Sequence, residues 1–114
     1  MVYFLIDMSF VYNLFKNNNS KNKVIWVNTT ARKIPGNLPE FDKYNTGTIN
    51  RNKAISDFTK EKQIPLIDFY TLSVNHLDYY EPDGIHFNQT GVAEEANAVT
   101  QEILKAIDNL KGNN

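Results

Sequence analysis

A carboxylate and an imidazole stand three residues apart in the segment Asp83-Gly84-Ile85-His86. A turn over this spacing can bring the Asp83 carboxylate onto one ring nitrogen of His86. Such a bond fixes the tautomer of the ring and stabilises its protonated form, which leaves the second nitrogen free to take a proton from a nucleophile. An Asp and a His this close also occur as a local cap or a solvated pair, so the spacing alone leaves both roles open.

The residues around this pair admit two further chemistries. Tyr79 and Tyr80 can line a pocket for an acyl group or a sugar, or one of them can pack on the following helix. Imidazole and carboxylate ligands suited to zinc, manganese or non-haem iron are also present, at His76, Asp78, Glu81, Asp83 and His86. Because nothing in the sequence fixes their relative positions, a metal centre ranks below the Asp–His pair.

The elements that must position this segment alternate between strand and helix. Apolar runs predict buried strands near 24–29 and 65–69, and runs without polar alternation are typical of parallel strands covered by helices. Helical spacing of apolar residues predicts helices near 3–16, 47–62 and 89–110. The sequence therefore predicts an α/β fold, with the Asp–His segment beyond the carboxyl end of a parallel strand, where such sheets place ligands.

Two asparagines and one long loop have structural interpretations. Asn88 can cap the last helix. Asn52 falls on the apolar face of the second helix, where we expect a structural hydrogen-bonding residue and no catalytic role. The stretch from Thr29 to about Thr46 is longer than a usual connection, and loops of this length are often functional.

Composition narrows the class of protein. The chain has 114 residues, which fits a single domain over 1–114, and 12 basic with 13 acidic residues give a net charge of −1. This balance provides no basic surface for nucleic acid. No apolar run approaches the roughly 20 residues of a membrane-spanning helix. Since cysteine is absent, disulfides, thiol nucleophiles and thiolate metal sites are excluded. The sequence shows no signal peptide and assigns no localisation.

The block Asp83-Gly84-Ile85-His86-Phe87-Asn88, followed by Gly91, resembles the last conserved block of the SGNH or GDSL-type esterases and lipases. Residues 24–30 look like the penultimate core strand of this family, 50–52 like the start of the next helix, and 64–70 like the last strand. The resemblance implies part of a three-layer α/β/α sandwich of the flavodoxin-like type, in which the long loop over 29–46 borders the site. It also implies hydrolysis of carboxylic esters through a serine acyl-enzyme without a cofactor, with His86 as general base and then acid and Asp83 as its orienting carboxylate.

The family's nucleophile has no counterpart in the chain. In the family, the serine lies in a Gly-Asp-Ser block at the start of the domain, and a Gly and an Asn from later blocks complete the oxyanion hole. None of these blocks is present, and no oxyanion donors can be placed beside Ser9 in the nearest segment, Ile6-Asp7-Met8-Ser9. We therefore expect the chain to correspond to the C-terminal half of an SGNH hydrolase domain.

The first predicted helix agrees with that expectation. Its apolar stripe is Phe4, Met8, Val11 and Phe15, widened by Leu5 and Tyr12, with Phe10 and Leu14 outside it. In the family this helix packs on a sheet that includes three earlier strands, which the chain lacks. The uncovered apolar surface would favour self-association or a complementing partner chain.

The expected function is thus carboxylic ester hydrolysis on a small ester or an acylated carbohydrate or lipid, with this chain carrying the Asp–His part of the triad. The competing hypothesis is a non-catalytic interaction module that retains an esterase-like frame. A metal-dependent enzyme is the third alternative.

Overall fold

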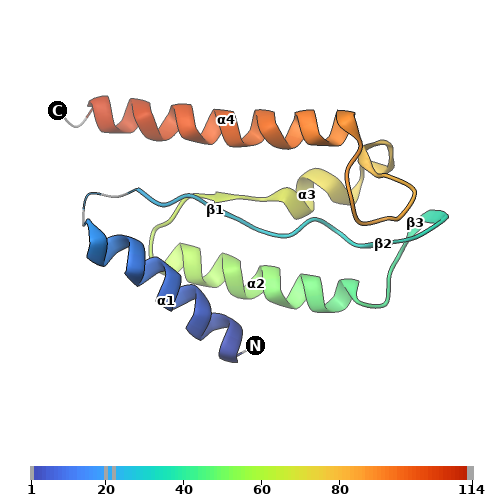
Figure 1. Cartoon of the computed structure of the whole chain (residues 1–114), viewed down its shortest axis with the longest axis horizontal. Helices are drawn as coiled ribbons and strands as arrows, with labels where there is room; N and C mark the ends of the chain where they lie inside the picture. Colours follow the sequence, from blue (N-terminus) through green and yellow to red (C-terminus); the bar gives the residue numbers. More distant parts are fainter. Residues whose placement is uncertain (1, 20, 22, 113–114) are drawn as a thin grey trace.

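Two short parallel strands lie at the centre of the molecule, with helices on both sides (Figure 1). The computed structural model describes residues 2–19, 21 and 23–112, and the side chains of residues 2–6 are outside the description. In chain order the elements are α1 (Val2–Asn18), β1 (Trp26–Val27), β2 (Lys33–Ile34), β3 (Asn37–Phe41), α2 (Asn45–Glu61), β4 (Leu66–Ile67), α3 (Phe69–Val74), the 3₁₀ helix η1 (Leu77–Tyr79) and α4 (Gln89–Gly112).

The pairing of β1 with β4 confirms the α/β class. Trp26 lies beside Leu66 and Val27 beside Ile67 in parallel register, and the Trp26 N–H donates to the Pro65 carbonyl at 2.9 Å. The predicted strands over 24–29 and 65–69 are longer than those observed. β4 ends early because the Asp68 side chain caps α3, accepting the Thr71 N–H at 3.0 Å. A sheet of two strands does not show the full three-layer sandwich.

The core forms where α2 packs on α1 and the sheet. Its buried members are Met8, Ile55, Phe58 and Ile64, with Tyr12, Val24, Trp26 and Leu66 packed around them. Phe58 lies at the centre of this core, because the rings of Tyr12 and Trp26 contact its ring edge-on at centroid distances of 6.1 and 5.8 Å. Ile49 of the same helix is exposed and lies outside this core.

α4 covers only part of the sheet. Asn88 caps the helix as predicted, its Oδ1 accepting the Gly91 N–H at 2.9 Å. The helix packs over β4, α3 and η1, and runs alongside the sheet on the side opposite α2 (Figure 1). Several apolar residues of this helix are exposed, at Val92, Ile103, Ile107 and Leu110. Among the described residues, no helix combines the length and apolar character that crossing a bilayer requires.

α1 contacts the rest of the chain through one part of its apolar face. Met8 is buried and Tyr12 half-buried, whereas Val11 and Phe15, one turn further on the predicted stripe, are exposed. The stripe therefore continues past the surface that α2 covers. The predicted stripe members Phe4 and Leu5 lie outside the described side chains.

The long loop after β1 contains a hairpin that the sequence analysis missed. β2 and β3 pair antiparallel, with Lys33 beside Phe41 and Ile34 beside Asn37. The turn between the strands needs a positive φ, which Gly36 supplies at 76°. The expectation of an irregular stretch from Thr29 to Thr46 is therefore wrong for residues 33–41.

Between β1 and β2 the backbone bonds mainly to side chains. The amide of Asn52 pairs with both backbone groups of Thr29, accepting its N–H at 3.0 Å and donating to its carbonyl at 2.8 Å. Asn52 is buried on α2. The expected structural hydrogen-bonding role of this residue is confirmed.

Further along the same segment, Ala31 and Arg32 are held from three other elements. The Ala31 N–H donates to the Ser73 Oγ at 3.0 Å, and the Ala31 carbonyl accepts the Tyr80 hydroxyl at 2.5 Å. The Arg32 N–H donates to the Asn45 Oδ1 at 2.7 Å. Buried backbone groups without such partners would cost free energy, so these side chains replace the missing strand neighbours.

Asn52→Ala should lower the free energy of unfolding by about 2 kcal/mol, because it leaves two backbone groups of Thr29 without partners. Asn50→Ala, at an exposed position of the same helix, should change it by less than about 0.5 kcal/mol. Urea unfolding followed by circular dichroism measures both. Equal effects of the two substitutions would contradict the role given to Asn52.

Candidate active site

The Asp83 carboxylate organises the turn that carries His86. One carboxylate oxygen, Oδ1, accepts the backbone N–H groups of Ile85 and His86, both at 2.9 Å. The other, Oδ2, lies 2.5 Å from His86 Nδ1. The sequence predicted this Asp–His bond, and the structure contains it. Asp83 therefore acts on the ring and on the backbone that presents it.

The electrostatics of the pair follow from these bonds. The hydrogen bond from His86, followed by the two backbone N–H groups, lowers the pKa of Asp83 to about 2. The same hydrogen bond and the charge of Asp83 raise the pKa of His86 above its usual value. The His86 side chain is 77% exposed, and no described residue bonds its Nε2. The ring is thus oriented at one nitrogen and accessible at the other.

The β2–β3 hairpin holds this turn from outside. The Lys33 N–H donates to the Gly84 carbonyl at 2.9 Å, and the Gly36 N–H donates to the Pro82 carbonyl at 3.2 Å. Gly84 has a φ of 74°, and a Cβ there would collide with the Lys33 carbonyl group. Glycine at this position therefore allows the close approach between hairpin and turn. The expectation that the loop over 29–46 borders the site is confirmed for its hairpin.

Tyr79 and Tyr80 form the base beneath the turn. They are 8% and 5% exposed, and their rings lie 6.1 and 5.0 Å from that of Phe87. Burial raises the pKa of Tyr80, so its hydroxyl stays protonated and donates to Ala31. The structure supports packing for both tyrosines. A substrate-lining role, the other predicted alternative, is not tested by these contacts.

Four of the five residues of the metal alternative form two separate pairs, His76–Asp78 and Asp83–His86. His76 Nδ1 lies 3.7 Å from Asp78 Oδ1, and the His76 ring stacks on Tyr79 at 4.3 Å. Over the described ranges of the chain, no three His, Asp or Glu side chains converge as metal ligands would. The arrangement therefore favours the Asp83–His86 pair over a metal centre.

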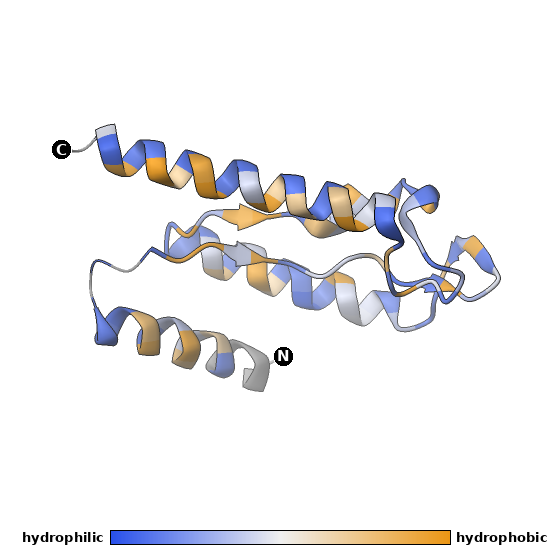
Figure 2. Ribbon diagram, turned by 45° about the horizontal axis from the view of Figure 1, so that its top comes forward, coloured by the Kyte–Doolittle hydropathy of each residue, from blue (hydrophilic) through white to orange (hydrophobic). Residues whose placement is uncertain are grey.

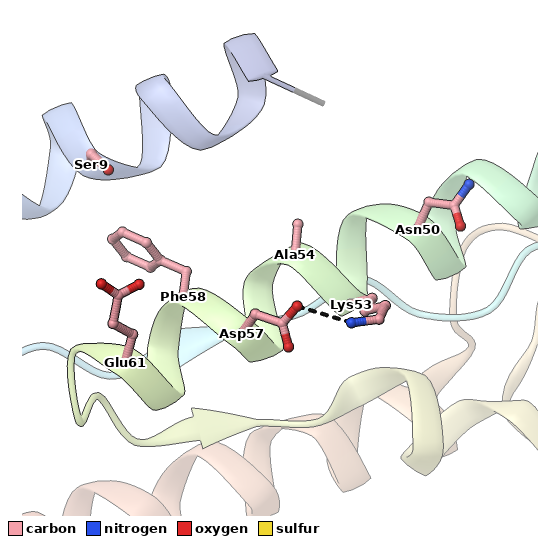
Figure 3. A pocket seen from close by; sticks show the side chains of 7 residues that line it. All are labelled: Ser9, Asn50, Lys53, Ala54, Asp57, Phe58 and Glu61. Carbon is pink, nitrogen blue, oxygen red and sulfur yellow. Dashed lines mark hydrogen bonds and ion pairs between the residues drawn. The ribbon is translucent and has the colours of Figure 1, made fainter.

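One pocket away from this turn lies between α1 and α2 (Figure 3). It has a volume of about 600 Å³ and is lined by Ser9, Asn50, Lys53, Ala54, Asp57, Phe58 and Glu61. Ser9, from the segment that most nearly matches the family's serine block, lines this pocket. Neither Asp83 nor His86 lines it. The structure thus does not bring Ser9 together with the pair.

Comparison with solved structures decides the fold. The esterase domain of the ORF1 protein from the zebrafish ZfL2-1 retrotransposon superposes with a TM-score of 0.75 at 12% identity, covering 87% of this chain and 56% of that one. The chain shares the fold of the part of this esterase domain that it covers. At the level of that shared fold, the resemblance to the esterases is confirmed.

Sequence relatives cover a shorter stretch. The "Putative O-acetyltransferase" of Staphylococcus aureus strain COL is 41% identical over 59 residues, which is 51% of this chain and 9% of that protein. Its counterpart from strain MW2 is 39% identical over the same length. The match thus spans less than a tenth of these relatives. No model of a protein family matches the chain.

Sequence reasoning missed the residues that hold the turn in place. Asn45, Ser73, Lys33 and Gly36 were not singled out, although Pro35-Gly36 between two short runs is a hairpin signal. Asn45 and Ser73 carry no local signal, because their partners are 13 and 42 residues away in sequence.

The His86 ring should titrate above pH 6.5, and Asp83→Asn should move the midpoint down, because the substitution removes the charge and the bond that favour the imidazolium. The matched control is Asp78→Asn, beside His76, which should leave the His86 midpoint unchanged. NMR of the ring protons measures each midpoint. An unchanged midpoint in Asp83→Asn would show that the pair does not form in solution.

Because these two pKa values differ between the folded and unfolded chain, the free energy of unfolding depends on pH. Because the folded pKa of His86 is raised, its contribution is complete below the unfolded value of about 6.5 and is lost as the pH rises through the folded value. For Asp83 the contribution is present above its ordinary value of 3.8 and is lost as the pH falls through about 2.

Proposed function

We propose that this chain supplies the acid–base half of an ester-cleaving active site, with His86 as general base and then acid and Asp83 as the carboxylate that orients it. One observation supports the proposal above others: Asp83 Oδ2 lies 2.5 Å from His86 Nδ1 on an exposed turn, in a chain with an esterase-domain fold. A local cap explains the backbone bonds of Asp83, but it does not require an imidazole with an open Nε2.

The proposed reaction proceeds through an acyl-serine. His86 Nε2 takes the proton of a serine hydroxyl while the serine oxygen adds to the ester carbonyl carbon, and the imidazolium then gives that proton to the departing alkoxide. In the second half, Nε2 takes a proton from the acceptor hydroxyl as its oxygen adds to the acyl carbon, and returns a proton to the serine. Throughout the reaction the Asp83 carboxylate accepts a hydrogen bond from the Nδ1–H group of His86 and stabilises the imidazolium.

In our proposal, residues outside this sequence supply the serine and the oxyanion donors. The chain contains no Gly-Asp-Ser block. Neither Asp83 nor His86 lines any of the five principal pockets of the described structure. The pocket for the substrate would therefore be completed by the same polypeptide that supplies the serine.

An acetyl ester is the substrate class that the relatives favour. The matched staphylococcal proteins carry the name O-acetyltransferase. The acyl-serine route above serves both hydrolysis and acetyl transfer. Water as the acceptor gives hydrolysis, whereas a carbohydrate hydroxyl gives acetyl transfer. The competing proposal is an interaction module without catalysis that retains the esterase-like frame.

We expect no turnover of p-nitrophenyl acetate by this chain alone above an inert-protein control, because an acid–base pair without nucleophile and oxyanion donors lacks most of the catalytic parts. Turnover that disappears in Ser9→Ala would contradict this expectation and assign the nucleophile to α1.

A hybrid enzyme tests the pair itself. Replacing the matched segment of the staphylococcal relative by the whole of this chain places Asp83 and His86 among that protein's own residues. In this hybrid, His86→Ala should lower kcat at least about a thousandfold and Asp83→Asn should lower it less. His76→Ala is the matched control and should leave kcat unchanged. A loss of less than about tenfold in His86→Ala would support the interaction module.

A further inference from the structure

One edge of the two-stranded sheet is unoccupied in the described structure. The N–H groups of Trp26 and Asn28 donate toward β4. Because backbone groups alternate along a strand, the N–H and C=O groups of Ile25 and Val27 face the opposite edge. No described residue pairs with them there. An open edge of this kind is a template for a further strand.

The sheet face above this edge is also uncovered. Trp26 packs on Phe58 of α2, so Val27 projects to the other face, the one on which α4 lies. Ile67, the neighbour of Val27 in register, is 6% exposed, whereas Val27 is 38% exposed. α4 therefore covers β4 and leaves β1 open.

α1 extends an apolar face on the same side of the molecule. In Figure 2, α1 lies on the β1 side of the sheet and α4 on the β4 side. Val11 follows the buried Met8 by three residues and so lies on the same helix face, yet it is 41% exposed. Phe15, four residues further, is also exposed. This apolar face continues the core beyond the area that α2 covers.

The solved esterase domain indicates what occupies this surface. The match covers 87% of this chain but 56% of the zebrafish domain, so a complete domain of this fold contains polypeptide with no counterpart here. A second copy of the chain would repeat the matched part and would not supply the remainder. The open strand edge, the exposed Val27 and the extended α1 face are the features expected where that remainder packs.

We propose that the β1 edge surface, defined as the backbone of Ile25 and Val27 with the side chains of Val11, Phe15 and Val27, binds a polypeptide that completes the esterase fold by adding a strand to β1. A parallel strand in this position ends on the same side as β1 and β4, whose carboxyl ends point toward the Asp83–His86 turn (Figure 1). The loop after the added strand would then reach His86. This last step rests on the proposed function; the docking itself does not.

The test uses the intact chain labelled with ¹⁵N and, as the probe, the part of the strain COL relative outside its 59 matched residues. NMR titration should shift the Ile25 and Val27 amides and protect them from hydrogen exchange. Val27→Pro removes the outward N–H without breaking a bond within this chain, and should weaken binding at least tenfold. Val11→Asp should have a similar effect, while Asn13→Asp, away from the Val11 face, should bind as the parent does.

Three results would overturn the proposal: no binding up to about 100 µM probe, binding that Val27→Pro leaves unchanged, or a complex of two copies of this chain through the same surface in sedimentation. Circular dichroism checks that each variant remains folded. His86→Ala should bind the probe as well as the parent. A failure of catalysis is thereby separated from a failure of docking, since binding without activity contradicts only the proposed function.

Discussion

The rest of the structure depends on how the backbone is satisfied between Asn28 and Lys33, where the chain has left the sheet. Buried N–H and C=O groups need partners, and here they come mostly from side chains: Asn52 of α2 for Thr29, Ser73 of α3 and Tyr80 for Ala31. These bonds join the segment to α2, to α3 and to the residue that follows η1. The segment therefore fixes the relative positions of α2, α3 and the residues after η1, which no strand ladder does.

The candidate site is attached to the far end of the same segment. Tyr80 bonds Ala31 from below the turn, and Lys33 bonds Gly84 from the hairpin. The turn is thus held on two sides, while the His86 ring remains exposed. This combination of a fixed backbone and an accessible Nε2 is what a general base requires, because its reach must be set before substrate arrives.

The sequence was sufficient wherever structure depends on local patterns. The helices α2 and α4, the Asn88 cap and the parallel order of β1 and β4 follow from apolar spacing and capping residues, and the Asp83–His86 bond follows from a three-residue spacing. It was insufficient where a long-range bond replaces a local preference. The strands are short because Asn52 bonds the backbone of Thr29 soon after β1, and because Asp68 caps α3 directly after β4. Tyr79 and Tyr80 are buried because Phe87 and Ala31 lie against them, which no pattern near the tyrosines indicates.

Hydrogen exchange at the amides of Thr29, Ala31 and Arg32 tests this account most directly. If side chains hold the segment as the structure shows, the Ala31 amide should exchange as slowly as that of Phe58 in the core helix α2, protected by about a thousandfold or more. Asn52→Ala should then accelerate exchange at Thr29 more than at Phe58. Exchange of Ala31 at the rate of an unstructured peptide, with Phe58 still protected, would contradict the claim that this segment organises the fold and the site.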